Sequence, residues 1–205
     1  MTLSGRFAAQ LAHPRGLGGR LLGQAMDIAN ARPRRFAVAA LAPKPGERVL
    51  DAGCGTGAAL AMLRTAADCR LYGIDRSDAM VTAARRRLGS GATLASESIE
   101  DLARQSWRPF DAVLALNLLY FADPQGAMVA ALREALRQGG RLVAYVTHRH
   151  TMERWRFARA GLHRLYDVGE LQDALVEGGF ARASISIKDL AVAPGIRGLV
   201  AHAER

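Results

Sequence analysis

The stretch that decides the fold is RVLDAGCGTGAAL, residues 48–60. It has the pattern of a short apolar strand that runs into a glycine-rich turn and then into an alanine-rich helix. The turn carries Gly53, Gly55 and Gly57, which leave bare backbone for a ligand to approach. This stretch therefore predicts a strand–turn–helix unit with a ligand held over the turn.

Beyond this unit, short apolar segments alternate with amphipathic ones. Strands are predicted over residues 48–52, 70–75, 92–96, 110–116, 141–147, 182–188 and 198–203, and helices over 57–67, 77–88, 99–104, 124–137 and 168–177. Such alternation favours right-handed crossovers and a mostly parallel sheet with helices on both faces. The last two predicted strands have no long helix between them, so one is expected to run antiparallel at the edge. We predict a doubly wound α/β fold with a seven-stranded, Rossmann-like sheet whose last strand is antiparallel.

The N-terminal part of the chain has a different pattern. Residues 1–42 are glycine-rich at first and then show apolar residues at helical spacing, and the sequence APKPGE (42–47) breaks that pattern. We expect a single domain over residues 1–205, in which a helical lid over 1–42 covers a Rossmann-like core over 43–205.

Composition and charge restrict the class of protein. Two cysteines are too few for a disulfide framework, and no Cys/His spacing typical of a metal site occurs, so we expect no metal and a reducing, cytoplasmic location. The most apolar run, AVLALNLLYFA (112–122), is far shorter than the ~20 residues of a membrane span. The net charge of +9 could attract nucleic acid, anionic lipid or an acidic substrate, but the arginines are scattered. Charge alone therefore names no partner.

Two kinds of ligand suit the glycine turn. The pattern Gly53-x-Gly55-x-x-Ala58 fits a dinucleotide fingerprint, and Asp75 ends the second strand about where that fingerprint requires an acid. Asp51, two positions before the first glycine, favours a different ligand. Its carboxylate would repel a pyrophosphate, whereas it would attract a cationic group. A ligand with a sulfonium and an amino group near the turn has that character.

These residues carry a resemblance to a known family. The segments VLDAGCGTG (49–57), LYGIDRSDAM (71–80), FDAVLALNLLYFADP (110–124) and ALREALRQGGRLVAYV (131–146) resemble, in order, motifs of the class I S-adenosylmethionine-dependent methyltransferases. The N-terminal segment resembles that of the small ubiquinone/menaquinone and phospholipid type. The resemblance implies S-adenosylmethionine as cofactor and S-adenosylhomocysteine as product. It also implies that Asp51, Gly53, Gly55 and Gly57 frame the methionine end and that Asp75 holds the ribose hydroxyls.

The adenine side departs from the family pattern. Ser98 stands where the family usually has an acid, so Ser98 or the neighbouring Glu97 is expected to take over that contact, and Ile99 would still offer its backbone N–H. Arg76 either stacks on the adenine or is an exposed arginine. Asn117, at the end of the fourth predicted strand, is expected to line the cofactor pocket.

Methyl transfer from a sulfonium needs position and a dry pocket more than a catalytic triad. The segment NLLY (117–120) has the spacing of the family's N-P-P-Y motif with both prolines replaced, which makes Tyr120 a candidate catalytic residue. A base is needed only if the acceptor arrives protonated. His148, at the end of the fifth predicted strand, is the first candidate for it, and His163 and Tyr166 are weaker ones.

The acceptor is expected on the side of the fourth and fifth strands. The N-terminal segment, with Met26 and Asn30, and the long excursion 147–166, with Trp155 and Phe157, could cover it. We expect methyl transfer to O, N or C of a small molecule. Alternatives are a quinone or phospholipid headgroup, with peripheral contact to a membrane surface, a nucleic acid, or a non-catalytic cofactor-binding role. No obligate nucleic-acid partner is expected, and the oligomeric state stays open.

Overall fold

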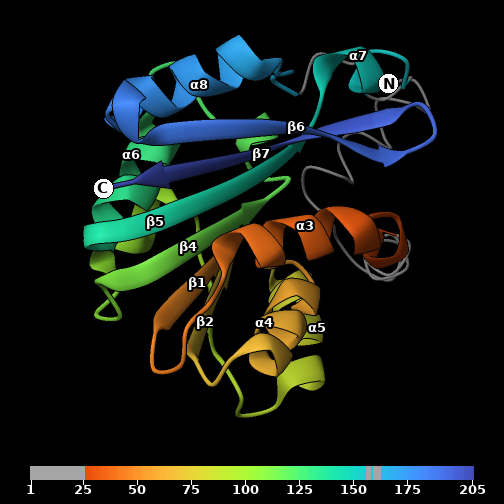
Figure 1. Ribbon diagram of the computed structural model, residues 1–205. Helices are drawn as coiled ribbons and strands as arrows, with labels where there is room; N and C mark the ends of the chain where they lie inside the picture. Colours follow the sequence, from red (N-terminus) through yellow and green to blue (C-terminus); the bar gives the residue numbers. More distant parts are fainter. Residues whose placement is uncertain (1–25, 156–157, 159–162) are drawn as a thin grey trace.

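The computed structural model describes residues 26–155, 158 and 163–205. One twisted sheet runs through the domain in the order β3-β2-β1-β4-β5-β7-β6 (Figure 1). Its strands are β1 (Arg48–Ala52), β2 (Arg70–Asp75), β3 (Thr93–Ser96), β4 (Phe110–Leu116), β5 (Leu136–Thr147), β6 (Ile185–Ala193) and β7 (Ile196–Glu204). The first five strands pair in parallel, and β7 runs antiparallel to both β5 and β6. The predicted fold class is confirmed.

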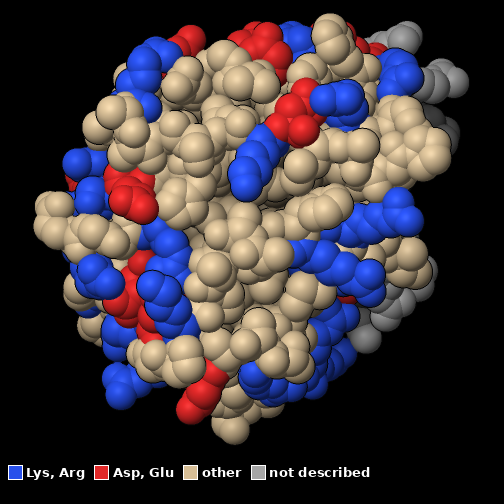
Figure 2. Space-filling model, viewed as in Figure 1, with Lys and Arg blue, Asp and Glu red and all other residues tan. Residues whose placement is uncertain are grey.

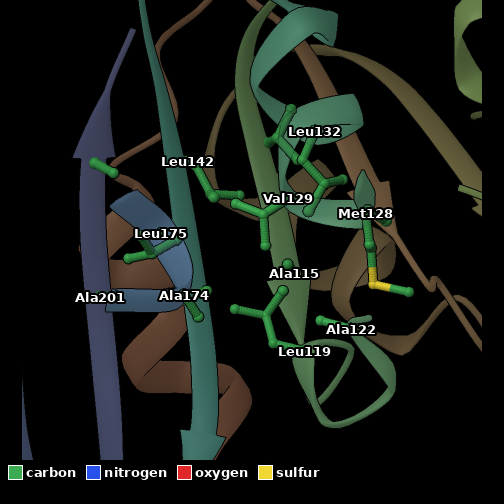
Figure 3. Close-up of a cluster of buried hydrophobic side chains, with 14 of the residues drawn as sticks. Ala115, Leu119, Ala122, Met128, Val129, Leu132, Leu142, Ala174, Leu175 and Ala201 are labelled. Carbon is green, nitrogen blue, oxygen red and sulfur yellow. The ribbon is translucent and has the colours of Figure 1, made fainter. Parts of the chain in front are cut away.

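Helices cover both faces of this sheet (Figure 1). The helices are α3 (Ala31–Leu41), α4 (Ala58–Ala66), α5 (Asp78–Leu88), α6 (Ala127–Ala135), α7 (Arg149–Met152) and α8 (Val168–Glu177). On one face α3 and α4 bury apolar side chains against alternate residues of the central strands, such as Val49 and Leu114. On the other face α6 and α8 pack over Leu50 and Val113. Figure 3 shows part of this second cluster, where Leu132 and Val129 of α6 lie close to Leu142 of β5.

The position of the antiparallel strand differs from the prediction. We expected an antiparallel strand at the edge, but β7 lies between β5 and β6, and β6 forms the edge. The burial of the two strands explains this order, since residues 198–201 of β7 are all buried, whereas β6 is mostly exposed or half-buried. A continuous apolar strand needs neighbours on both sides and cover on both faces.

The helix predicted over 124–137 is shorter, and the strand that follows is longer. The Asp123 carboxylate accepts the backbone N–H groups of Ala127 and Met128 at 3.0 Å, and α6 begins there. The pair Gly139–Gly140 lies within β5, which begins at Leu136. A side chain at Gly140 would lie 3.1 Å from the Phe110 carbonyl oxygen, so a close approach of strands requires glycine there.

Within the described ranges, no helix is both long and apolar enough to cross a membrane. The residues predicted as the first part of the lid, up to residue 25, and Phe157 lie outside the described residues. Of the predicted lid, the structure therefore describes only the part from Met26 onward.

Candidate functional site

A cavity of about 260 Å³ opens where β1, β2 and β4 end. In the strand order, β2 lies on one side of β1 and β4 on the other, so this is the point at which the direction of winding reverses. Open α/β sheets bind ligands at such a point, beyond the carboxyl ends of the strands. Residues from the β1 and β2 ends, the segment after β3 and the β4 end line the cavity, together with Met26, Asp27, Asn30 and Arg34 from the N-terminal side.

The glycines of the turn have two different roles: some line the cavity, and one allows two helices to pack closely. Gly53 and Gly55 line the cavity with φ of 72° and 51°, in the left-handed region that favours glycine. A side chain at Gly55 would meet nothing within 4 Å, so its backbone faces open space. Gly57, also predicted to frame the ligand, does not line the cavity. A Cβ there would lie 3.0 Å from Ala84 and Leu88, which shows that Gly57 serves the close packing of α4 on α5.

Asp51 presents a buried carboxylate with no hydrogen-bond partner. The residue is 1% exposed, lines the cavity, and neither carboxylate oxygen has a partner among the described residues. Burial raises the pKa of Asp51 to about 7, Asp75 adds to the rise by repulsion, and the positive charge of Arg34 opposes it. A buried carboxylate without donors is costly. This position therefore fits a ligand group that is cationic and donates hydrogen bonds.

Asp75 is held in place by backbone donors. Its Oδ2 accepts the N–H of Gly55 and its Oδ1 accepts the N–H of Ser77, both at 2.9 Å. Burial raises the pKa of Asp75, and the two N–H groups and Arg76 work against that rise. The loop is thereby tied to the end of β2. A carboxylate oxygen accepts more than one hydrogen bond, so Asp75 can also bind a pair of ligand hydroxyls.

The segment after β3 contributes the predicted adenine residues. Glu97, Ser98 and Ile99 all line the cavity. The Ser98 hydroxyl donates to an Asp101 carboxylate oxygen at 3.1 Å, and Glu97 accepts from Gln105 Nε2 at 2.5 Å. The polar groups at the two positions considered for the missing acid thus already have partners inside the protein.

Arg76 lines the cavity and also contacts an aromatic ring. Its guanidinium carbon lies 5.6 Å from the centre of the Phe121 ring. Burial is the main cause that lowers the pKa of Arg76, and the charge of Asp75 opposes it. Arg76 is exposed and also lines the cavity, so its position agrees with both of the predicted roles.

Asn117 lines the cavity and links it by hydrogen bonds to the N-terminal segment and to β5. It adopts φ of 56°, a left-handed conformation that is uncommon without glycine. Its Nδ2 donates to Asn30 Oδ1 at 3.0 Å, and its Oδ1 accepts the Tyr120 hydroxyl at 3.1 Å. The Tyr120 oxygen in turn accepts the N–H of Thr147 at 2.5 Å. This chain of hydrogen bonds fixes the N-terminal segment, the β4 end and the β5 end relative to one another.

A second, larger cavity of about 1040 Å³ adjoins the first. Met26, Asn30, Asn117 and Phe121 line both cavities, so the two spaces meet at these residues. Tyr120, Trp155 and His163 line the second cavity, whereas His148 and Tyr166, which were also candidates on the acceptor side, do not. Burial lowers the pKa of His163, which favours a neutral imidazole.

The hydroxyl of Tyr120 is already engaged in hydrogen bonds within the protein, which limits its possible role in catalysis. It is buried, and its hydroxyl both donates to Asn117 and accepts from Thr147. Burial raises the pKa of Tyr120, so the phenol stays protonated. These contacts make Tyr120 a residue that positions Asn117 rather than a base.

His148 does not line either cavity. Its Nδ1 accepts the N–H of His150 at 3.2 Å and so caps α7, and its ring is buried and stacks on His150. Its Nε2 lies 3.9 Å from an oxygen of Asp189. The prediction of His148 as the base is not supported, because the strand end turns this side chain toward β6. Tyr166 is likewise buried, and its hydroxyl donates to the Leu119 carbonyl at 2.7 Å.

One polar cluster at the glycine turn was not predicted. Thr56 of the turn donates to Asp27 at 2.8 Å, Arg87 of α5 pairs with Asp27 at 2.8 Å, and the same guanidinium donates to Thr56 at 3.0 Å. These residues lie 29 or more positions apart, so local patterning carries no signal for the contact. In the part of the chain that the structure describes, no group of three or more His, Cys, Asp or Glu is placed to hold a metal.

Comparison with known proteins agrees with this geometry. A family described as a methyltransferase domain matches residues 49–140. Protein-L-isoaspartate O-methyltransferase from Methylorubrum populi is 38% identical over 109 residues, which cover 52% of this chain and 48% of that protein. The ubiquinone biosynthesis O-methyltransferase from Xylella fastidiosa is 33% identical over 110 residues, which cover 52% and 44%. The chain thus spans about half the length of these relatives.

The fold is also shared with a solved structure. The putative methyltransferase solved in complex with the Haloferax volcanii Trm112 methyltransferase activator superposes with a TM-score of 0.77, covering 100% of this chain and 98% of that chain. The sequence identity is 17%, so this likeness concerns the fold alone.

Proposed function

The chain belongs to the class I S-adenosylmethionine-dependent methyltransferases, and we propose that it transfers the methyl group of S-adenosylmethionine to O, N or C of a small molecule. The relatives that support the family are matched over about half of their length. The proposed activity and acceptor therefore rest on the residues that line the two cavities.

The observation that carries the proposal is the buried carboxylate of Asp51 beside the glycine turn. Its two partnerless oxygens fit an ammonium group and a nearby sulfonium, which together supply the missing donors and charge. A nicotinamide dinucleotide would instead place its pyrophosphate over the same turn, close to the carboxylates of Asp51 and Asp75. The residues present fit S-adenosylmethionine better.

The rest of the first cavity supports the same cofactor. Asp75 would accept the two ribose hydroxyls, and the open space over Gly55 would admit the ligand backbone. Ile99 is buried at the cavity wall and offers an apolar contact for the adenine. Arg76 and Phe121 would cover the opposite side.

The protein's part in the reaction is to orient the acceptor and to exclude water. S-adenosylmethionine, when bound, would supply an electrophilic methyl group: an acceptor atom would bond in line to the methyl carbon as the carbon–sulfur bond breaks, and the sulfur would leave as a neutral thioether. Met26, Asn30, Asn117 and Phe121 surround the junction of the two cavities, where acceptor and methyl group would have to meet. The left-handed Asn117, held by Asn30 and Tyr120, would fix that junction.

A base is needed only for an acceptor that arrives protonated. His163 is the histidine that lines the second cavity, and its lowered pKa favours the neutral form that a base requires. We therefore assign this role to His163 instead of His148. A quinone or phospholipid acceptor at a membrane surface is the alternative, and the ubiquinone O-methyltransferase among the relatives favours it over a nucleic acid.

Calorimetry tests the proposal directly. S-adenosylhomocysteine should bind to the purified chain, whereas NAD and NADP should not. Asp51→Asn keeps the shape of the side chain and removes its charge, so it should weaken S-adenosylhomocysteine binding by about 1.5–3 kcal/mol, the contribution of hydrogen bonds to a charged group. Binding of NAD with an affinity above that of S-adenosylhomocysteine would refute the proposal.

A further inference from the structure

The second cavity carries positive charge and no carboxylate among its described lining residues. Arg32, Arg35 and Arg154 line it, and all three are exposed. Arg32 donates to the carbonyl of Val192 at 2.9 Å and Arg154 to that of Gly195, so the partners of both are neutral. Many other arginines of the described chain pair with carboxylates. The positive charge of these guanidinium groups is therefore available to bind an acidic ligand.

The arginines lie at one end of the cavity. Arg32 and Arg35 belong to α3, and Arg32 and Arg154 reach the ends of β6 and β7 near Val192 and Gly195. Figure 2 shows basic side chains gathered beside the start of α3, between this helix and the tip of the β6–β7 hairpin labelled in Figure 1. We call this end the arginine rim.

The second cavity meets the cofactor cavity at a junction where Met26, Asn30, Asn117 and Phe121 line both spaces. Apart from the arginine rim, the walls of the second cavity are largely apolar. The wall residues are Tyr120, Tyr145, Met152, Trp155, Val192 and Ile196. The cavity thus combines a charged rim, apolar walls and a junction beside the proposed methyl group.

Building on the proposed function, we infer that the methyl acceptor is an acidic amphiphile. Its carboxylate or phosphate lies at the arginine rim, its apolar body packs against the apolar walls, and its methyl-accepting atom reaches the junction with the cofactor cavity. Guanidinium groups bind carboxylate and phosphate through paired N–H donors, and an apolar wall with few polar groups is typical of small-molecule pockets. The accepting atom and the acidic group are then different groups of the acceptor.

Binding without any cofactor tests this inference. Trp155 lines the cavity, so its fluorescence reports on occupancy, and Trp107→Phe removes the signal of the second tryptophan. The probes are decanoate, decyl phosphate, decanol and decyltrimethylammonium as monomers. The two acidic probes should bind about tenfold more tightly than decanol, and decyltrimethylammonium most weakly. Equal affinity of decanoate and decanol would overturn the inference.

Three glutamine variants separate the arginine rim from the general charge of +9. Arg35→Gln and Arg154→Gln should each weaken decanoate binding by about two- to fivefold and leave decanol unchanged, the range of an exposed, screened charge pair. Arg86→Gln is the matched control, because Arg86 is exposed on α5 and lines neither cavity. A loss of the same size in Arg86→Gln would show that net charge attracts the acids, which contradicts a built site.

Vesicles distinguish a free acid from a lipid headgroup. Sedimentation with phosphatidylglycerol vesicles but not with phosphatidylcholine vesicles, reversed by Arg35→Gln, would identify a membrane lipid as the source of the acidic group. Decanoate binding without sedimentation would identify a free amphiphile. The proposed function stands or falls separately, because S-adenosylhomocysteine calorimetry measures the first cavity and the probes measure the second.

Discussion

The hydroxyl of Thr56, in the middle of the glycine turn, donates to the carboxylate of Asp27 over 2.8 Å. This contact ties the N-terminal segment to the loop that frames the proposed cofactor site. Arg87 completes the cluster by pairing with Asp27 and donating to Thr56. Thr56 thereby links the turn to the N-terminal segment, and both Thr56 and Asp27 line the cavity.

Loss of this contact should loosen the link between the turn and the N-terminal segment. Thr56→Val keeps the shape of the side chain and removes the hydroxyl, so S-adenosylhomocysteine should dissociate faster and bind roughly 0.5–1.5 kcal/mol more weakly, the net value of a hydrogen bond. Stopped-flow and calorimetry measure both effects. Thr56→Ser, which keeps the hydroxyl, should behave like the wild type. Equal dissociation rates in Thr56→Val and Thr56→Ser would show that this contact does not affect ligand binding.

Asp51 should make stability depend on pH. Its folded pKa of about 7 lies above the ordinary value of 3.8, so the folded state holds a proton that the unfolded state releases. Its contribution is fully present below pH 4 and is lost as the pH rises toward and through 7. As the pH rises from 4 to 7, denaturant titrations should therefore show the wild type losing stability relative to Asp51→Asn. Parallel curves would contradict a buried, partnerless carboxylate.

The same titration should appear in ligand binding. S-adenosylhomocysteine carries an ammonium group, which Asp51 attracts only in its charged form. Binding should tighten as the pH rises from 5.5 to 8, and Asp51→Asn should flatten this dependence. Calorimetry across this range gives the comparison.

Asp75→Ala should weaken S-adenosylhomocysteine binding by about 1.5–3 kcal/mol, because it removes hydrogen bonds to a charged group. It also frees the N–H groups of Gly55 and Ser77, which Asp75 accepts. Asp75→Asn retains acceptor capacity on one oxygen and should fall between wild type and Asp75→Ala. An unchanged affinity in Asp75→Ala would mean that the ribose lies elsewhere.

Two glycines of the turn should respond differently to alanine. Gly57→Ala places a Cβ 3.0 Å from Ala84 and Leu88 at φ of 77°, so it should lower the free energy of unfolding by about 1–3 kcal/mol. Gly55→Ala meets open space and should cost less stability while it weakens ligand binding. Thermal melts and calorimetry on both variants separate the roles. The reverse order of effects would exchange the assignments of the two glycines.

Ser98→Asp tests the departure at the adenine side. An acid there restores the family pattern, but the side chain at 98 lies beside Asp101, to which the Ser98 hydroxyl donates. The single variant should therefore gain little affinity for S-adenosylhomocysteine, because two carboxylates would face each other. Ser98→Asp combined with Asp101→Asn should bind more tightly than the single variant. If the single variant alone gains the full effect, Asp101 does not restrict this position.

Local patterning in the sequence was enough to predict most of the elements and to bring Asp51 and Asp75 to one cavity. The strands over 48–52, 70–75 and 110–116 and the helix over 168–177 match the structure at both ends. Their signals lie in neighbouring residues, as runs of apolar side chains and as turn chemistry. Asp51 and Asp75 stand near the ends of two such strands, on either side of the glycine turn in the chain. Parallel strands end at the same edge of a sheet, so the sequence could assign both carboxylates to one cavity.

The features that depend on distant neighbours emerged only in the folded chain. There β7 is inserted between β5 and β6, Asp27 contacts Thr56 and Arg87, and His148 turns away from the second cavity while His163 lines it. The pairing of β5 with β7 and the contacts of Asp27 with Thr56 and Arg87 join segments whose separation in the chain exceeds the reach of a helical or strand repeat. The direction of a side chain at the end of a strand depends on the residues packed around it. The apolar and polar pattern of neighbouring residues in the sequence does not specify that packing.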